Sequence, residues 1–152
     1  ARVFRFGNVV GPRQTHGVGF DFVRRLTSDP SQLRILGDGK QSKSYIHIYD
    51  VVAAVLCANT AEPAAFRAFN VATGDTITVT EIADLAVEVL GLTQPPEYRY
   101  TGGDRGWKGD VPIIRLNTDR IRALGWTCER GCRQALRQSL LSLAADERTN
   151  HE

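Results

Sequence analysis

Residues 36–52 of the chain read Leu36-Gly-Asp-Gly-Lys-Gln-Ser-Lys-Ser-Tyr-Ile-His-Ile-Tyr-Asp-Val-Val52. The segment joins a tight Gly-Asp-Gly turn, a cationic side chain at Lys43, a short apolar strand and a helix that Asp50 is expected to cap. Cations and backbone N–H groups that converge from separate elements bind anions. We therefore interpret residues 36–52 as a small anion-handling unit.

Strands and helices alternate on both sides of this segment. Apolar runs predict strands, and apolar residues at helical spacing predict helices. The expected extended segments are 2–10, 33–36, 45–48, 66–72 and 94–100, and the expected helices are 18–27, 51–60, 79–90, 118–125 and a last one with the apolar stripe Cys132, Leu136, Leu140 and Leu143. Thr78 and Glu81 form a capping box, Gly91 closes the same helix, and Asn117 caps the short one.

This alternation predicts an α/β fold, with a single domain over residues 1–152 and a frayed tail at 146–152. The strands at 3–10 and 66–72 are nearly continuous apolar runs, which is typical of strands buried on both faces of a parallel sheet. The predicted elements do not make a complete doubly wound sheet around them. We therefore expect their neighbours to come from outside this chain, and we expect a homo-oligomer.

Charge and cysteine content narrow the class of protein. The 152 residues include 19 Lys and Arg against 17 Asp and Glu, and the cations are spread out, which disfavours nucleic acid as a partner. No apolar run is long enough to span a bilayer and no signal-peptide pattern is present, so we expect no membrane partner and a cytoplasmic location. Three cysteines fit a reducing compartment. A metal site at Cys128 and Cys132 is disfavoured, because no second ligand pair accompanies them.

Three segments together resemble one protein family. They are Arg5-Phe-Gly-Asn-Val-Val-Gly-Pro-Arg13, the segment 36–52 and Gly102-Gly-Asp-Arg-Gly-Trp-Lys-Gly-Asp-Val-Pro112. Their order is similar to that of the extended short-chain dehydrogenases/reductases, the NAD-dependent epimerases and dehydratases that act on sugars linked to UDP, dTDP or GDP. UDP-glucose 4-epimerase-like enzymes are the most similar. The resemblance implies the C-terminal substrate-binding portion of such an enzyme, with strands that complete a Rossmann-type sheet whose N-terminal part is absent. The neighbours of these strands would then come from the missing N-terminal Rossmann half or from a partner subunit.

The catalytic motifs of that family do not occur in the chain. None of the four tyrosines has a lysine four residues later, so the Tyr-x-x-x-Lys pair is missing and no catalytic residue is assigned. The Gly17-Val18-Gly19 motif is followed by Phe22, where a dinucleotide-binding loop has its third glycine. The resemblance implies NAD as cofactor of the full-length enzyme, but we expect this chain alone to be inactive and to bind NAD poorly.

The first two segments imply most of the binding residues. By resemblance, Asn8 hydrogen-bonds the diphosphate or the sugar, and the backbone of Phe6 and Gly7 passes beside the nicotinamide. Lys43 is the candidate cation for the diphosphate, where the family usually has Arg followed by Asp. A lysine is a point charge without the two-pronged geometry of arginine. Two further roles follow from the resemblance, Tyr45 with its hydroxyl on the phosphates and Leu36 packed against the base.

The late segment implies two more contacts. By resemblance, Arg105 is a second diphosphate cation, with Lys108 as the alternative, and Asp110 accepts hydrogen bonds from ribose hydroxyls. Trp107 lies against the base or anchors the loop. Which base, which sugar and which reaction the enzyme handles stay open.

Simpler interpretations of the same residues exist. Asn8 could end a strand, Lys43 could be a surface lysine, and the late loop could be a connection. A triad of Ser44, His47 and Asp50 is disfavoured, because strand alternation puts Ser44 and His47 on opposite faces. The competing functional hypothesis is a stand-alone, non-catalytic nucleotide-sugar-binding or assembly module.

Overall fold

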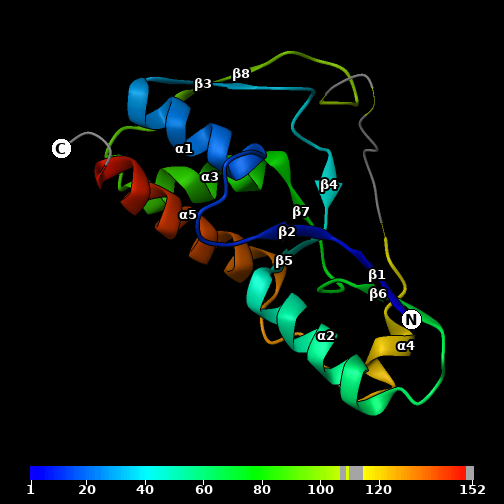
Figure 1. The fold of residues 1–152 in the computed structure, drawn as a ribbon. Helices are drawn as coiled ribbons and strands as arrows, with labels where there is room; N and C mark the ends of the chain where they lie inside the picture. Colours follow the sequence, from blue (N-terminus) through cyan, green and yellow to red (C-terminus); the bar gives the residue numbers. More distant parts are fainter. Residues whose placement is uncertain (107–108, 110–114, 150–152) are drawn as a thin grey trace.

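A computed structural model describes residues 1–106, 109 and 115–149 of the chain. The described elements, in chain order, are β1 (Arg2–Phe6), β2 (Asn8–Val10), α1 (Val18–Ser28), β3 (Gln32–Ile35), β4 (Ser42–Lys43), β5 (Tyr45–His47), α2 (Ile48–Ala61), β6 (Arg67–Val71), β7 (Ile77–Thr78), α3 (Val79–Leu90), β8 (Glu97–Tyr100), α4 (Asp119–Arg122) and α5 (Cys132–Thr149). Strands and helices alternate as expected for an α/β protein (Figure 1).

The described strands form four separate pairs. β1 pairs with β6, β2 with β5 and β3 with β8, all three in parallel, whereas β4 and β7 are antiparallel. The prediction of one continuous strand over residues 2–10 is wrong. At Gly7 the chain changes partner, because the Gly7 N–H donates to the Val71 carbonyl at 2.9 Å and the next N–H, of Asn8, donates to the Ser44 carbonyl at 3.0 Å. A Cβ on Gly7 would lie 3.3 Å from that Ser44 oxygen, so glycine suits this crossing.

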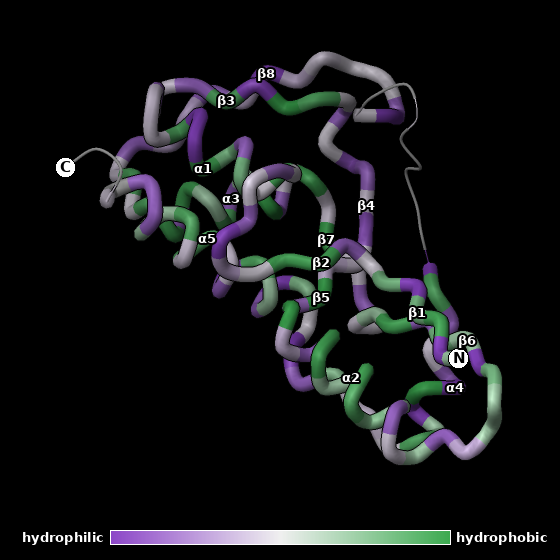
Figure 2. Tube along the Cα trace, in the orientation of Figure 1, coloured by the Kyte–Doolittle hydropathy of each residue, from purple (hydrophilic) through white to green (hydrophobic). Residues whose placement is uncertain are grey.

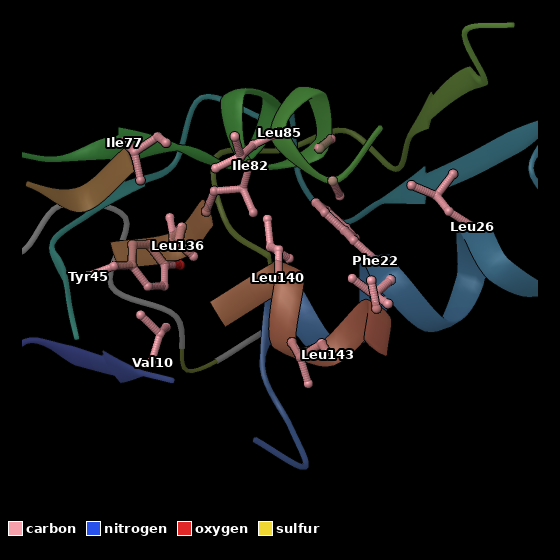
Figure 3. Close-up of a cluster of buried hydrophobic side chains, with 14 of the residues drawn as sticks. Val10, Phe22, Leu26, Tyr45, Ile77, Ile82, Leu85, Leu136, Leu140 and Leu143 are labelled. Atoms are coloured by element: carbon pink, nitrogen blue, oxygen red, sulfur yellow. The ribbon is translucent and has the colours of Figure 1, made fainter. Parts of the chain in front are cut away.

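The larger of two apolar cores lies among α1, α3 and α5. Figure 3 shows side chains of these helices meeting Val10 from β2 and Tyr45 from β5. The predicted buried sides of α1 and α5 are confirmed, with Phe22, Val23 and Leu26 on α1 and the whole Cys132 stripe on α5. α5 continues to Thr149, and the frayed tail over residues 146–152 stays a prediction. Residues 150–152 lie outside the described part.

The start and the end of α3 agree with the sequence. The Thr78 hydroxyl accepts a hydrogen bond from the Glu81 backbone N–H at 3.2 Å, and the Glu81 carboxylate accepts one from the Thr78 N–H at 2.8 Å. The Thr78 hydroxyl also donates to the Glu81 carboxylate at 2.7 Å, and this bond, together with the one from the Thr78 N–H, holds the pKa of Glu81 below its usual value. Gly91 ends the helix in the left-handed conformation, with φ of 68°. Contacts between residues close in sequence therefore determine where α3 begins and ends.

The smaller core joins α2 and α4 to β1 and β6, and here two predicted caps are wrong. His47, not Asp50, caps α2, and its Nδ1 accepts a hydrogen bond from the Tyr49 N–H at 3.3 Å. Asp50 is 2 % exposed inside the first turn, where its carboxylate pairs with Arg130 at 3.2 Å. Thr118 occupies the cap position of α4, which is one turn long, while the Asn117 side chain accepts from the Asp119 N–H.

Apolar side chains remain at the surface around the smaller core. Among the described residues, β1 pairs only with β6, and Val3, Phe6 and Phe66 are exposed along this pair. On α2, Tyr49, Val52 and Leu56 are exposed as well. The hydropathy colours of Figure 2 show apolar segments along α2 in the lower part of the view. No helix in the described part of the chain is both long enough and apolar enough to cross a membrane.

Candidate functional site

A pocket of about 440 Å³ opens between the start of α1, the turn after β3 and the strands β2, β4 and β5. The loop between β2 and α1 supplies one wall, and the face of α1 supplies another. The lining residues are Asn8, Val9, Val10, Gln14, His16, Gly17, Val18, Gly19, Asp21, Phe22, Arg25, Arg34, Leu36, Gln41, Lys43, Tyr45, Val79, Gly106 and Leu136.

Four of the predicted binding residues meet in this pocket. Asn8, Leu36, Lys43 and Tyr45 all line it, although they come from two segments of the sequence. β2 and β5 bring Asn8 directly opposite Tyr45 in the parallel pair. The Asn8 side-chain amide donates to the Ser44 carbonyl at 3.2 Å, so it also fastens these two strands together. Their contacts with a ligand stay a prediction.

The other predicted binding residues lie elsewhere. Phe6 and Gly7, at the end of β1, are not among the residues lining this pocket. Arg105 is exposed, and its backbone carbonyl lies 3.0 Å from the position that a Cβ on Gly37 would take. From the late loop, Gly106 lines the pocket. Asp110, Trp107 and Lys108 lie outside the described residues.

A buried polar network supports the strands that carry Lys43 and Tyr45. The Ser44 and Thr73 hydroxyls are 2.9 Å apart, and the Thr73 hydroxyl lies 3.1 Å from the Cys132 sulfur. The Tyr45 N–H donates to the same sulfur at 3.1 Å. Burial raises the pKa of the Cys132 thiol, so the group is neutral and acts as a hydrogen-bonding link. This network ties the pocket strands to the first turn of α5.

Asp75 completes that link. Its carboxylate accepts the Cys132 N–H at 3.0 Å and 3.1 Å, at the N-terminus of α5, where backbone N–H groups otherwise lack partners. Burial opposes ionisation of this carboxylate, but hydrogen bonds from Thr73 and Cys132 outweigh it and hold the pKa of Asp75 below its usual value. Asp75 therefore caps α5 from a loop 57 residues earlier in the chain.

Several pocket residues were missed by sequence reasoning. Arg34 and Leu36 are two positions apart in an extended segment and so share a face, and Arg25 follows Val18 by seven positions on one face of α1. Those spacings could have identified both arginines. Gln41 is buried, its Nε2 donates to the Leu36 carbonyl at 2.9 Å, and its Oε1 has no hydrogen-bond partner in the described part of the chain. No local sequence signal distinguishes this glutamine.

The members of the disfavoured triad have other partners. Ser44 bonds Thr73, His47 accepts from Tyr49 and Asp50 pairs with Arg130. Burial, helped by the Arg130 charge, holds the pKa of His47 below its usual value. Burial likewise raises the pKa of Cys128 to about 11. No group of three or more His, Cys, Asp or Glu side chains suited to a metal ion occurs within residues 1–106, 109 and 115–149.

Parallel strand pairs, the helices beside them and a pocket next to a glycine turn define the chain as part of an α/β protein. Residues 1–72 match the model of the NAD dependent epimerase/dehydratase family. This part of the chain therefore carries the pattern of the family, and the chain matches the C-terminal portion of solved epimerase structures. The predictions of the family and of the fold class are confirmed.

Individual relatives agree with this assignment. A crystal structure of a UDP-galactose 4-epimerase superposes with a TM-score of 0.82 at 35 % identity, over 95 % of this chain and 45 % of that one. A UDP-glucose 4-epimerase of Thermotoga maritima with UDP-glucose gives 0.76 at 29 % identity, over 99 % and 47 %. A protein of Methanocaldococcus jannaschii, provisionally named UDP-glucose 4-epimerase, is 26 % identical over 97 % of this chain and 47 % of its own length. The chain thus spans about half the length of these relatives.

Proposed function

We propose that the chain is the substrate-binding part of an NAD-dependent nucleotide-sugar epimerase or dehydratase. Among these enzymes we favour one that resembles the UDP-sugar 4-epimerases. Its role is to hold the nucleotide diphosphate. The observation that supports this proposal is the meeting of Asn8, Leu36, Lys43 and Tyr45 in one pocket. The resemblance of the sequence motifs assigns a binding role to all four residues, and the same pocket is also lined by Arg25 and Arg34.

The chemistry of the pocket suits a nucleotide diphosphate. Lys43 offers a positive charge, and the Asn8 amide offers a neutral polar group, so two negatively charged phosphates meet both a cation and a hydrogen-bonding group. Leu36 presents exposed apolar surface on which a base ring can pack. Tyr45 contributes its phenol in the proposed contact with the phosphates. Arg105 and Asp110 complete the proposed site from the late loop, as diphosphate cation and ribose acceptor.

NAD is the cofactor named in the family description. The residues of this chain fit only a part of that group. Phe6 is exposed at the end of β1 and is proposed, with the Gly7 backbone, to border the nicotinamide, but the Gly7 N–H is already bonded to the Val71 carbonyl. The sequence has no glycine-rich loop for the pyrophosphate and no Tyr-x-x-x-Lys pair. We therefore propose that the chain alone binds NAD weakly and does not turn over a sugar nucleotide.

In this proposal the chain contributes orientation. Binding energy from the nucleotide, which does not react, holds the sugar where the rest of the enzyme can act on it. A stand-alone nucleotide-sugar-binding module is the second candidate, and the observation that favours it is that residues of this chain line a pocket of about 440 Å³. The intact mass of the endogenous polypeptide separates the two candidates. A mass near twice 16.8 kDa supports the enzyme part, and a mass near 16.8 kDa supports the module.

The proposed grip is tested by calorimetric titration of the chain with UDP-glucose, dTDP-glucose and GDP-mannose. Lys43→Ala should weaken the binding of the preferred ligand about tenfold or more, because a charge-assisted contact is lost. Lys40→Ala is the matched control. Lys40 is an exposed lysine three residues earlier that does not line the pocket, so its removal should change the dissociation constant less than about twofold. Equal losses in both variants, or no binding of any of the three ligands, would contradict the proposal.

A further inference from the structure

The loop of residues 11–17 forms one wall of the pocket and has an unusual backbone. Gln14, His16 and Gly17 from this loop line the pocket. Arg13 has a φ of 59° and Gly17 a φ of 98°, two left-handed conformations within five residues. An arginine in that conformation is unfavourable by itself, so contacts from elsewhere must hold the loop.

Ser139, in the middle of α5, supplies those contacts. Its side chain is 1 % exposed, and its hydroxyl oxygen accepts a hydrogen bond from the Gly11 N–H at 3.2 Å. The same oxygen lies 3.2 Å from the Gly11 carbonyl and 3.1 Å from Oε1 of Gln14. A hydroxyl has a single proton to donate, so it bonds one of these two acceptors at a time.

Gln14 passes the contact on to the pocket wall. While its Oε1 faces Ser139, its Nε2 donates to the His16 carbonyl at 2.7 Å. The two ends of one amide group therefore face the helix and the loop tip, which fixes the orientation of the amide. The amide also packs tightly on the loop, because a Cβ on Gly17 would lie 2.9 Å from Nε2.

The same turn of α5 supports the pocket on either side of Ser139. Leu136, three residues earlier, lines the pocket itself. Leu140, the next residue, lies against the start of α1, where a Cβ on Gly19 would come within 3.2 Å of its Cδ2. Nothing in the three resembling segments includes α5, so the sequence assigns no binding role to this helix.

We propose that Ser139 is a positioning residue for nucleotide-sugar binding, which acts through the Gln14 amide to hold the loop 11–17 as a preformed wall of the pocket. The proposal rests on the proposed function for its ligand. Preforming the wall reduces the entropy that binding must overcome, so losing the anchor should weaken binding without removing any group that touches the ligand. Ser139 itself is not among the residues that line the pocket.

The test is a double-mutant cycle on the affinity for UDP-glucose, with Ser139→Ala, Gln14→Ala and the double variant. Each single variant should weaken binding about 2- to 10-fold. The affinity of the double variant should equal that of the single variant that binds UDP-glucose less tightly, because both substitutions remove the same link. Ser142→Ala is the matched control, because Ser142 lies on the same helix and its hydroxyl bonds only the Gln138 carbonyl in the described part. The proposal would be overturned if the loss of affinity in the double variant equals the product of the two single losses. Unchanged affinity in Ser139→Ala would overturn it as well.

A second measurement keeps the test independent of the ligand. In the NMR spectrum of the ligand-free chain, the Gln14 side-chain amide and the Gly17 backbone amide should shift in Ser139→Ala and stay unchanged in Ser142→Ala. If the wild-type chain binds none of the nucleotide sugars, the proposed function fails, while these shifts still decide whether Ser139 anchors the loop. Gln14→Ala changes a partly exposed loop residue, so it gives a folded variant even if Ser139→Ala is unstable. Unshifted amide signals would overturn the anchor.

Discussion

Two parts of the molecule bury their apolar side chains to different extents. The part around α1, α3 and α5 is the binding half, and the part around α2, β1 and β6 is the exposed half. Around α1, α3 and α5 most long apolar residues are buried. Leu141 on α5 is an exception, as are Val9 and Leu36 beside the pocket, and Leu36 is proposed to contact the base. Around α2, β1 and β6 many stay exposed, such as Leu56 at 61 % and Phe66 at 63 %. Exposed apolar clusters of this kind usually mark surfaces that another polypeptide covers. We therefore propose that another polypeptide covers the surface around α2, β1 and β6.

The comparison also explains where the pocket lies. Its lining residues come from the half with the complete core and from the central strands β2, β4 and β5. Preorganised binding groups need supports that do not move, and the buried network around Cys132 provides one. The exposed half, in contrast, carries Phe6 and Gly7, which are proposed to border a cofactor that we expect this chain alone to bind weakly.

The largest expected effect is a loss of stability in the binding half. Leu140→Ala should lower the free energy of unfolding by about 2–5 kcal/mol, because the side chain is fully buried against α1 and α3. Leu56→Ala, in the exposed half, should cost less than about 0.5 kcal/mol. Urea unfolding followed by circular dichroism measures both. Leu141→Ala is the neighbouring control on the same helix, with a leucine that is 42 % exposed. Equal costs for Leu140 and Leu56 would remove the contrast between the halves.

The next effect concerns the ion pair that joins the halves. Asp50 belongs to α2, and Arg130 precedes α5, so their contact at 3.2 Å connects the two cores. Asp50→Ala should lower the free energy of unfolding by about 3 kcal/mol, because it leaves the Arg130 charge partly buried without its main partner. Glu129→Ala removes an exposed carboxylate 3.3 Å from the same arginine and should cost less than about 1 kcal/mol. A loss as large in Glu129→Ala would show that Asp50 has no special role.

Local patterns predicted the helices of the binding half well. The capping box at Thr78 and the apolar stripe of α5 depend on residues three or four positions apart, and both are confirmed. The cap of α2 was predicted wrongly because the position of Asp50 depends on Arg130, 80 residues later. The break at Gly7 was missed for the same reason, since the partners of Gly7 and Asn8, Val71 and Ser44, are distant in sequence. Sequence periodicity carries no information on such partners.

The candidate site shows the same division. Asn8, Leu36, Lys43 and Tyr45 were predicted from motifs, and they line one pocket. Gln14 and Gln41 could not be found in this way, because each reaches the pocket through hydrogen bonds to the backbone or to a remote helix. The motifs describe groups proposed to touch a ligand. The groups that hold those residues in place become visible only when the chain is folded.

A smaller effect should appear at the start of α2, on the boundary between the halves. Burial lowers the pKa of His47 in the folded chain below its ordinary value of 6.5, so the unfolded chain binds more protons at mildly acidic pH. The contribution of neutral His47 to the free energy of unfolding should therefore have its full value above about pH 6.5 and should decrease as the pH falls below it. Between pH 7.5 and 5.5, urea unfolding should show this decrease in the wild type and a flatter profile in His47→Asn, which keeps a capping side chain. An equally steep profile in His47→Asn would assign the titration to another group.

The smallest change in stability, but the sharpest test of the comparison, comes from the exposed apolar side chains. Leu56→Ser and Phe66→Ser together should change the free energy of unfolding by less than about 1 kcal/mol, because both side chains are mostly in water. They should, however, lower self-association, since the surface around α2 and β6 is the one expected to bind another polypeptide. Light scattering over a range of concentrations should show oligomers for the wild type and a larger monomer fraction for the double variant. A wild-type chain that stays monomeric throughout would mean that this half is stable in water as it is, and that its exposed side chains need no partner.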